Sequence, residues 1–160
     1  MRGAYDYYNE SGVASIEYEI NKTLNTLSKN EKGFFMMYEE AYIDKHCHNQ
    51  DELNAYYAVL RFNQAIGIFM EFACYNPETM VIITADHETS GMTSDGQGGY
   101  VSTHGNHTSQ YVPVFAWGAD AACFDGKVIE NVQIPKTIAD LMVPGIQFGM
   151  YGYESLLNKD

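Results

Sequence analysis

The histidines of this 160-residue chain are gathered in one part of it. All five lie within 62 consecutive positions, at His46, His48, His87, His104 and His107. Two of them have a carboxylate at a spacing that suits shared ligation, because Asp44 is four residues before His48 and Asp86 directly precedes His87. Imidazole and carboxylate ligands without thiolates suit zinc or another borderline divalent ion. The pattern therefore predicts a metal site.

Each of these groups also has an ordinary structural interpretation. An Asp and a His four residues apart fit a solvated helix start with a surface imidazole, whereas an Asp-His pair directly behind an apolar run lies where sites are built, which favours ligation. Glu39 and Glu40 end another apolar run, and we expect one to be solvated and the other to face the site. His46 and His104 fit polar loop residues better than ligands.

The elements that must position these residues alternate along the chain. Three-and-four spacing of apolar residues predicts helices at residues 12–30 and 51–74, with a last helix at residues 135–142. Short apolar runs predict strands at residues 34–38, 80–84 and 111–117, and a stretch without periodicity at 90–109 predicts a loop. This order indicates one α/β domain over residues 1–160, with a mostly parallel sheet covered on both faces by helices.

Composition excludes several classes. Nine Lys and Arg against 21 Asp and Glu give a net charge of −12 without a basic cluster, so no nucleic-acid partner is expected. Apolar runs fall short of the length of a membrane span, and residues 1–10 lack the apolar core of a signal peptide. Three cysteines, Cys47, Cys74 and Cys123, indicate neither a disulfide framework nor a thiolate zinc site.

Three separated blocks of the sequence closely resemble the alkaline phosphatases, and they occur in the same order as in that family. They are residues 32–39 (KGFFMMYE) followed by 43–48 (IDKHCH), residues 81–89 (VIITADHET), and Gly105-Asn106-His107-Thr108 with Val112-Pro113-Val114-Phe115-Ala116 behind it. The resemblance runs from about Ser11 to Met142 and leaves the last eighteen residues uncovered. It implies part of an alkaline-phosphatase-like three-layer sandwich and metal-dependent phosphomonoester hydrolysis, with an exported, periplasmic or extracellular, and dimeric protein.

The resemblance also implies roles for single residues. The three ligands of a first zinc are Asp44, His48 and His107, and two ligands of a second zinc are Asp86 and His87. Glu39 resembles the magnesium ligand, and Lys45 falls where the family has a Lys or His near the phosphate. In that family two zinc ions clamp a phosphomonoester while a serine attacks phosphorus.

The chain departs from the family at the catalytic residues. None of its eight serines follows an Asp, as the family nucleophile does, and Arg2 and Arg61 do not match the phosphate-binding arginine. We therefore expect a C-terminal portion of an alkaline phosphatase that is inactive on its own. Glu40 and Ser90 stand where glycine is common, His104 stands where Thr is usual, and the 90–109 loop is short for a lid.

Other interpretations remain open from the sequence. The metal ligands overlap with those of phosphodiesterases, sulfatases and phosphoglycerate mutases of the same superfamily, although the Gly-Asn-His-Thr block favours the phosphatase. A non-catalytic zinc-binding or self-associating module is a further alternative. A partial sheet would expose a strand edge and apolar helix faces, so we expect homo-oligomers or self-association.

Overall fold

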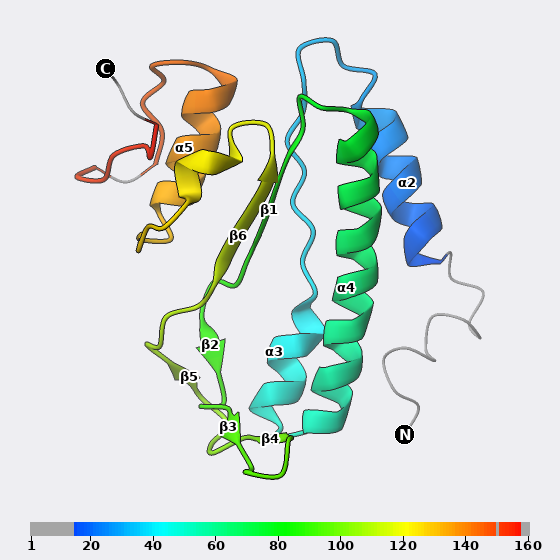
Figure 1. Ribbon diagram of the computed structural model, residues 1–160, viewed down its shortest axis with the longest axis vertical. Helices are drawn as coiled ribbons and strands as arrows, with labels where there is room; N and C mark the ends of the chain where they lie inside the picture. The colour runs from blue at the N-terminus through cyan, green and yellow to red at the C-terminus, as the bar shows by residue number, and fades with distance from the viewer. Residues whose placement is uncertain (1–14, 150, 158–160) are drawn as a thin grey trace. The chain divides into compact units, whose positions relative to one another are not determined.

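The computed structural model describes residues 15–149 and 151–157 (Figure 1). These form two compact units, one of the described residues up to Phe72 with His87–Pro113, the other of Ala73–Asp86 with the described residues from Val114 onward. The single domain expected over residues 1–160 stays a prediction. The first residues of the predicted 12–30 helix, and Arg2, lie outside the described residues.

The helical core of the first unit confirms two predicted helices. Helix α2 (Ile16–Leu27) begins at Ser15, whose hydroxyl accepts a hydrogen bond of 3.2 Å from the Tyr18 N–H. Helix α4 (Glu52–Tyr75) lies beside it (Figure 1), and the core is formed where Ile20 and Leu24 meet Ala65. These three side chains are almost fully buried, which follows from their three- and four-residue spacing.

The predicted strand at residues 34–38 is wrong as a sheet member, although the backbone there is extended. Phe34, Met36 and Tyr38 pack against the α2–α4 core, whereas Phe35 and Met37 between them are exposed. This alternation is that of a strand. A strand also needs a hydrogen-bonded neighbour, and no strand of the described residues pairs with this segment.

A short helix that the sequence did not predict follows this segment. Helix α3 (Ala41–His48) begins at Glu40, whose side chain accepts a 3.3 Å hydrogen bond from the Tyr42 N–H. Eight residues are too few for a helix to be stable in isolation, so tertiary contacts must hold it. One such contact is the ion pair of Glu40 with Arg61 of α4.

The predicted loop at residues 90–109 contains two nested antiparallel pairs. The outer pair joins β2 (Glu88–Thr89) to β5 (His107–Thr108), and the inner pair joins β3 (Thr93–Ser94) to β4 (Tyr100–Val101) (Figure 1). Ser90 lies between them with a left-handed φ of 76°, and its carbonyl accepts hydrogen bonds from the N–H groups of Thr103 and His104. Hydrogen bonds therefore order this stretch, and the spacing of apolar residues along the sequence does not predict them.

The second unit contains two of the predicted strands, paired in the opposite sense to the prediction. Strand β1 (Met80–Thr84) has the predicted bounds and pairs antiparallel with β6 (Val114–Gly118), with Ile82 opposite Ala116. The parallel sheet is wrong for the described strands, since all three pairs are antiparallel. No crossover helix lies between β1 and β6, so β6 returns from the end at which β1 finishes.

The remaining elements of this unit follow β6. A 3-10 turn, η1 (Ala121–Phe124), buries Phe124, and helix α5 (Gln133–Met142) confirms the last predicted helix. Inside α5 the buried Thr137 hydroxyl donates to the Gln133 carbonyl at 2.7 Å and accepts from the Leu156 N–H at 2.9 Å. Thr137 thus ties the chain near residue 156 to α5.

Within residues 15–149 and 151–157, no helix combines the length and the apolar character that crossing a membrane requires.

Candidate metal centre

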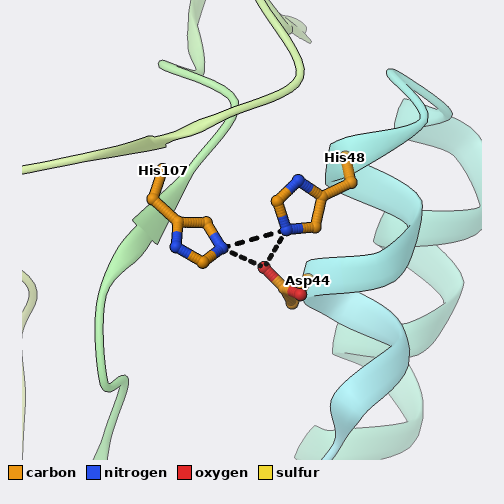
Figure 2. A group of neighbouring side chains, drawn as sticks. All are labelled: Asp44, His48 and His107. Atoms are coloured by element: carbon orange, nitrogen blue, oxygen red, sulfur yellow. Dashed lines mark hydrogen bonds and ion pairs between the residues drawn. The ribbon is translucent and has the colours of Figure 1, made fainter.

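Three of the predicted ligands come together in the first unit. Helix α3 carries Asp44 and His48 on one face because they are four residues apart, and β5 brings His107 to them (Figure 2). Asp44 Oδ1 lies 3.3 Å from His48 Nε2 and 3.3 Å from His107 Nε2, and the two Nε2 atoms are 2.9 Å apart. Among the residues that the structure describes, these three side chains offer ligand atoms close enough together to hold one metal ion.

The separations between these atoms can be compared with a zinc site. Ligand atoms about 2.0–2.2 Å from zinc and at tetrahedral angles lie about 3.3–3.6 Å from one another. Both oxygen–nitrogen separations fall at this value, and the nitrogen–nitrogen separation is slightly shorter. Two imidazoles and one carboxylate, all at least partly exposed, are also a donor set of the kind that holds catalytic zinc. The residues present therefore fit a zinc ion.

A hydrogen bond to the backbone fixes which nitrogen of His48 faces the group. His48 Nδ1 lies 2.8 Å from the Gly105 carbonyl oxygen. A carbonyl can only accept, so Nδ1 carries the proton and Nε2 keeps its lone pair for a metal. Histidine ligands of metals are commonly oriented in this way.

Thr89 of β2 connects the group to a fourth predicted ligand. Its hydroxyl donates to Asp44 Oδ1 at 2.6 Å and lies 3.2 Å from His87 Nδ1. Because the Thr89 hydroxyl proton is donated to the carboxylate, the Thr89 oxygen accepts a hydrogen bond from His87 Nδ1–H. In the neutral imidazole, His87 Nε2 then carries no proton. The His87 ring stacks on the His107 ring, with 3.5 Å between centroids.

The charge of Asp44 is secured by its neighbours. Partial burial alone would raise the pKa of this carboxyl. The hydrogen bond from Thr89 and the nearby His48, His107 and His87 imidazoles outweigh that effect, so the pKa of Asp44 lies below its ordinary value. Asp44 is therefore ionised, as a ligand must be, throughout the neutral range.

The remaining predicted metal ligands do not join the group. Glu39 is exposed, whereas Glu40 is buried and paired with Arg61, so the solvated member of the two glutamates is the one that the resemblance assigned to magnesium. Asp86 belongs to the second unit, where its carbonyl accepts a 2.7 Å hydrogen bond from Asn131 Nδ2. The roles of Glu39 and Asp86 stay predictions.

Lys45, His46 and His104 also lie outside the ligand group. The Lys45 ammonium lies 4.9 Å from the centre of the Tyr42 ring, and its predicted phosphate contact stays untested. His46 lies 3.7 Å from a carboxylate oxygen of Asp51, and His104 Nδ1 accepts from the Asn106 N–H at 3.2 Å. Neither histidine is a member of the group formed by the described residues.

Sequence reasoning missed two residues that orient the ligands, Thr89 and Gly105. Thr89 had a detectable signal, because residues i and i+2 of a strand share a face and Thr89 is two positions after His87. Gly105 acts through its carbonyl and had no side-chain signal.

Gly105 leads to a prediction. A Cβ added at Gly105 would lie 2.5 Å from the His48 backbone oxygen, so Gly105→Ala must push β5 away from α3. We expect a loss of about 1–3 kcal/mol in the free energy of unfolding, measured by urea denaturation, together with weaker zinc binding. Gly67→Ala on α4 is the matched control, since its Cβ meets nothing within 4 Å. Equal stability of the two variants would contradict the prediction.

Comparison with known proteins gives a consistent result. The family model described as alkaline phosphatase matches residues 7–104. Alkaline phosphatase 4 of Bacillus subtilis is 37% identical over 89 residues, 56% of this chain and 19% of the relative. The alkaline phosphatase of Escherichia fergusonii is 30% identical over 133 residues, 69% of this chain and 28% of the relative. The chain thus spans less than a third of the length of these curated relatives.

Solved structures support the same assignment at the level of the fold. The alkaline phosphatase from the Antarctic bacterium TAB5 matches with a TM-score of 0.65 and 27% identity, covering 78% of this chain and 38% of that one. A mutant of the TAB5 enzyme with Mg bound in the M3 site matches with a TM-score of 0.61 and 31% identity, covering 66% and 35%. The expected class, a partial alkaline-phosphatase-like α/β fold, is confirmed.

Proposed function

This chain belongs to the alkaline phosphatase family, and from that premise we propose that it carries one zinc site of a metal-dependent phosphomonoesterase. The observation that supports this most is the meeting of Asp44 Oδ1, His48 Nε2 and His107 Nε2, from two elements 59 residues apart in sequence, with both oxygen–nitrogen separations at the value for zinc ligands. His87, stacked on His107, would be a ligand of a second zinc, with Asp86 beside it in sequence. Glu39 would bind magnesium.

The chemistry of such a site is divided between ion and protein. Bound zinc would supply a Lewis acid for the phosphoryl oxygens of a phosphomonoester. The protein keeps Asp44 ionised through Thr89 and fixes the imidazole of His48 through Gly105. The exported location of this family is proposed for the complete protein.

We further propose that the chain does not hydrolyse phosphomonoesters alone. No serine follows an Asp, and the Arg61 side chain is engaged with Glu40, so neither a nucleophile nor a phosphate-binding arginine is evident. With zinc and magnesium, pure chain should show no turnover of p-nitrophenyl phosphate. Turnover that is lost in Asp44→Ala would contradict the proposal.

Zinc binding itself is tested by calorimetry at pH 7.5. We expect the chain to bind zinc in the micromolar range or more tightly, and His48→Ala to lose this binding because it removes a ligand. The control is His46→Ala, which removes a histidine from the same helix but outside the group. No heat of binding in the unmodified chain at micromolar zinc would refute the proposal.

A second proposal concerns self-association. The extended segment 34–38 exposes Phe35 and Met37 on the face opposite the core, and exposed apolar strand-like segments tend to pair with another chain. We expect dimers or larger species in sedimentation velocity at tens of micromolar, and less association for Phe35→Lys/Met37→Lys. Monomer across that range would contradict this.

A further inference from the structure

Glu88 makes contacts that neither the family resemblance nor the proposed ligand set explains. It lies on β2, one residue after His87 and half-buried. Its carboxylate accepts hydrogen bonds from the Gly91 N–H at 3.2 Å, from the Met92 N–H at 3.1 Å and from the Thr108 hydroxyl. Hydrogen bonds to an ionised acceptor are about twice as strong as neutral ones.

The position of Thr108 gives this cluster its significance. In the β2–β5 register Glu88 is opposite Thr108, and Thr89 is opposite His107. Each of these strands has two residues, so the ladder contributes few backbone hydrogen bonds. The bond from Thr108 to Glu88 therefore adds a side-chain link between the strands, at the residue next to the ligand His107.

The two side chains of β2 thus act on different members of the metal group. Thr89 holds the carboxylate of Asp44, which comes from α3. Glu88 holds the strand that carries His107 and, through Gly91 and Met92, the turn that leads into the inner hairpin. Without the Glu88 link, β5 could shift along β2 and carry His107 Nε2 away from Asp44 Oδ1, now 3.3 Å apart.

We infer that Glu88 is a positioning residue for the metal group, which sets the place of His107 through its hydrogen bond with Thr108. This inference rests on the proposed zinc site. Residues that orient metal ligands typically change metal affinity by about 10–100-fold when replaced. Glu88 and Thr108 should therefore affect zinc affinity although neither is a ligand.

The test measures zinc affinity by calorimetry in the full chain. Glu88→Gln keeps the shape of the side chain but weakens the acceptor, and Thr108→Val removes the hydroxyl at equal volume. Both should bind zinc about 10–100-fold more weakly, and the double variant should be no weaker than the more affected single variant, because the two changes break one link. Thr108→Ser, which keeps the hydroxyl, should bind like the unmodified chain.

Asp95 provides a matched control for loop order alone. Its carboxylate also accepts from two backbone N–H groups of a turn, those of Gln97 and Gly99, but has no bond to β5. Asp95→Asn should leave zinc affinity unchanged, even if both Asp95→Asn and Glu88→Gln lower the melting temperature of the metal-free chain.

The outcomes separate the inference from the proposal beneath it. Unmodified chain that binds no zinc removes the proposed function. Zinc binding by the unmodified chain together with unchanged affinity in Glu88→Gln and Thr108→Val overturns the inference while leaving the site in place. Equal losses in Asp95→Asn and Glu88→Gln also overturn it, because they would reveal a general effect of loop order.

Discussion

Replacing Glu40 by Ala is expected to lower the free energy of unfolding by about 3–5 kcal/mol. The Glu40 side chain is 1% exposed and that of Arg61 is 11% exposed, so the two charges are paired away from water. Arg61 contacts the glutamate through Nε and Nη2, and removal of the carboxylate takes this charge partner away from a largely buried guanidinium. Helix α3 loses its N-terminal cap at Tyr42 in the same step.

The neighbouring residue offers a control for this prediction. Glu39 has the same side chain but is exposed, so Glu39→Ala should change stability by no more than about 0.5 kcal/mol when measured by urea unfolding with chelator present. The double variant Glu40→Leu/Arg61→Leu should recover most of the loss, because apolar pairs of similar volume replace buried ion pairs at little cost. Equal stability of Glu39→Ala and Glu40→Ala would show that the Glu40–Arg61 pair does not stabilise the fold.

The Glu40–Arg61 ion pair matters for the metal site because helix α3 carries two of its ligands. This helix of eight residues presents Asp44 in its first turn and His48 at its end. Glu40 binds the start of α3 to α4 through Arg61. The ion pair thus supports the helix that carries two of the three ligands.

Long periodic segments were predictable from the sequence, and contacts that depend on pairing were not. The bounds of β1 and, within one residue, of α4 followed from local apolar patterns. The apolar run at residues 34–38 predicted a paired strand wrongly, because pairing depends on a neighbour that local sequence does not reveal. Helix α3 was missed because it is short and polar, so its periodicity is weak.

The same distinction between local patterns and contacts that depend on pairing applies to the residues of the site. The four-residue spacing of Asp44 and His48 is a local signal, and the resemblance supplied His107, 59 residues away from His48. Glu88 and Thr89 were missed in their roles because these depend on the β2–β5 register, which nests around another hairpin. The local sequence around Thr89 therefore does not predict that its hydroxyl donates a hydrogen bond to Asp44.

Zinc is expected to stabilise the chain against unfolding, and Asp44→Asn to abolish that effect. A ligand present at 100 times its dissociation constant adds about 2.7 kcal/mol to the free energy of unfolding if only the folded state binds it. Asp44 supplies the one carboxylate of the three-residue ligand group, so replacing it by a neutral amide removes the negative charge that the group offers to the ion. The measurement is the urea midpoint with zinc and with chelator, and Thr23→Val on α2, far outside the ligand set in sequence, is a control that should keep the zinc effect.

Acid should weaken the zinc effect. Zinc binds imidazole only in its neutral form, so protons compete with the ion and the difference between zinc and chelator should shrink as the pH falls. The pKa of Asp44 is lowered in the folded state, so the stability due to its charge is fully present above its unfolded-state pKa and is lost only as the pH falls through the folded-state value. With an ordinary value of 3.8, that second loss lies below about pH 4. A zinc effect that did not shrink with falling pH, or that survived in Asp44→Asn, would mean that the ion binds elsewhere than at Asp44, His48 and His107.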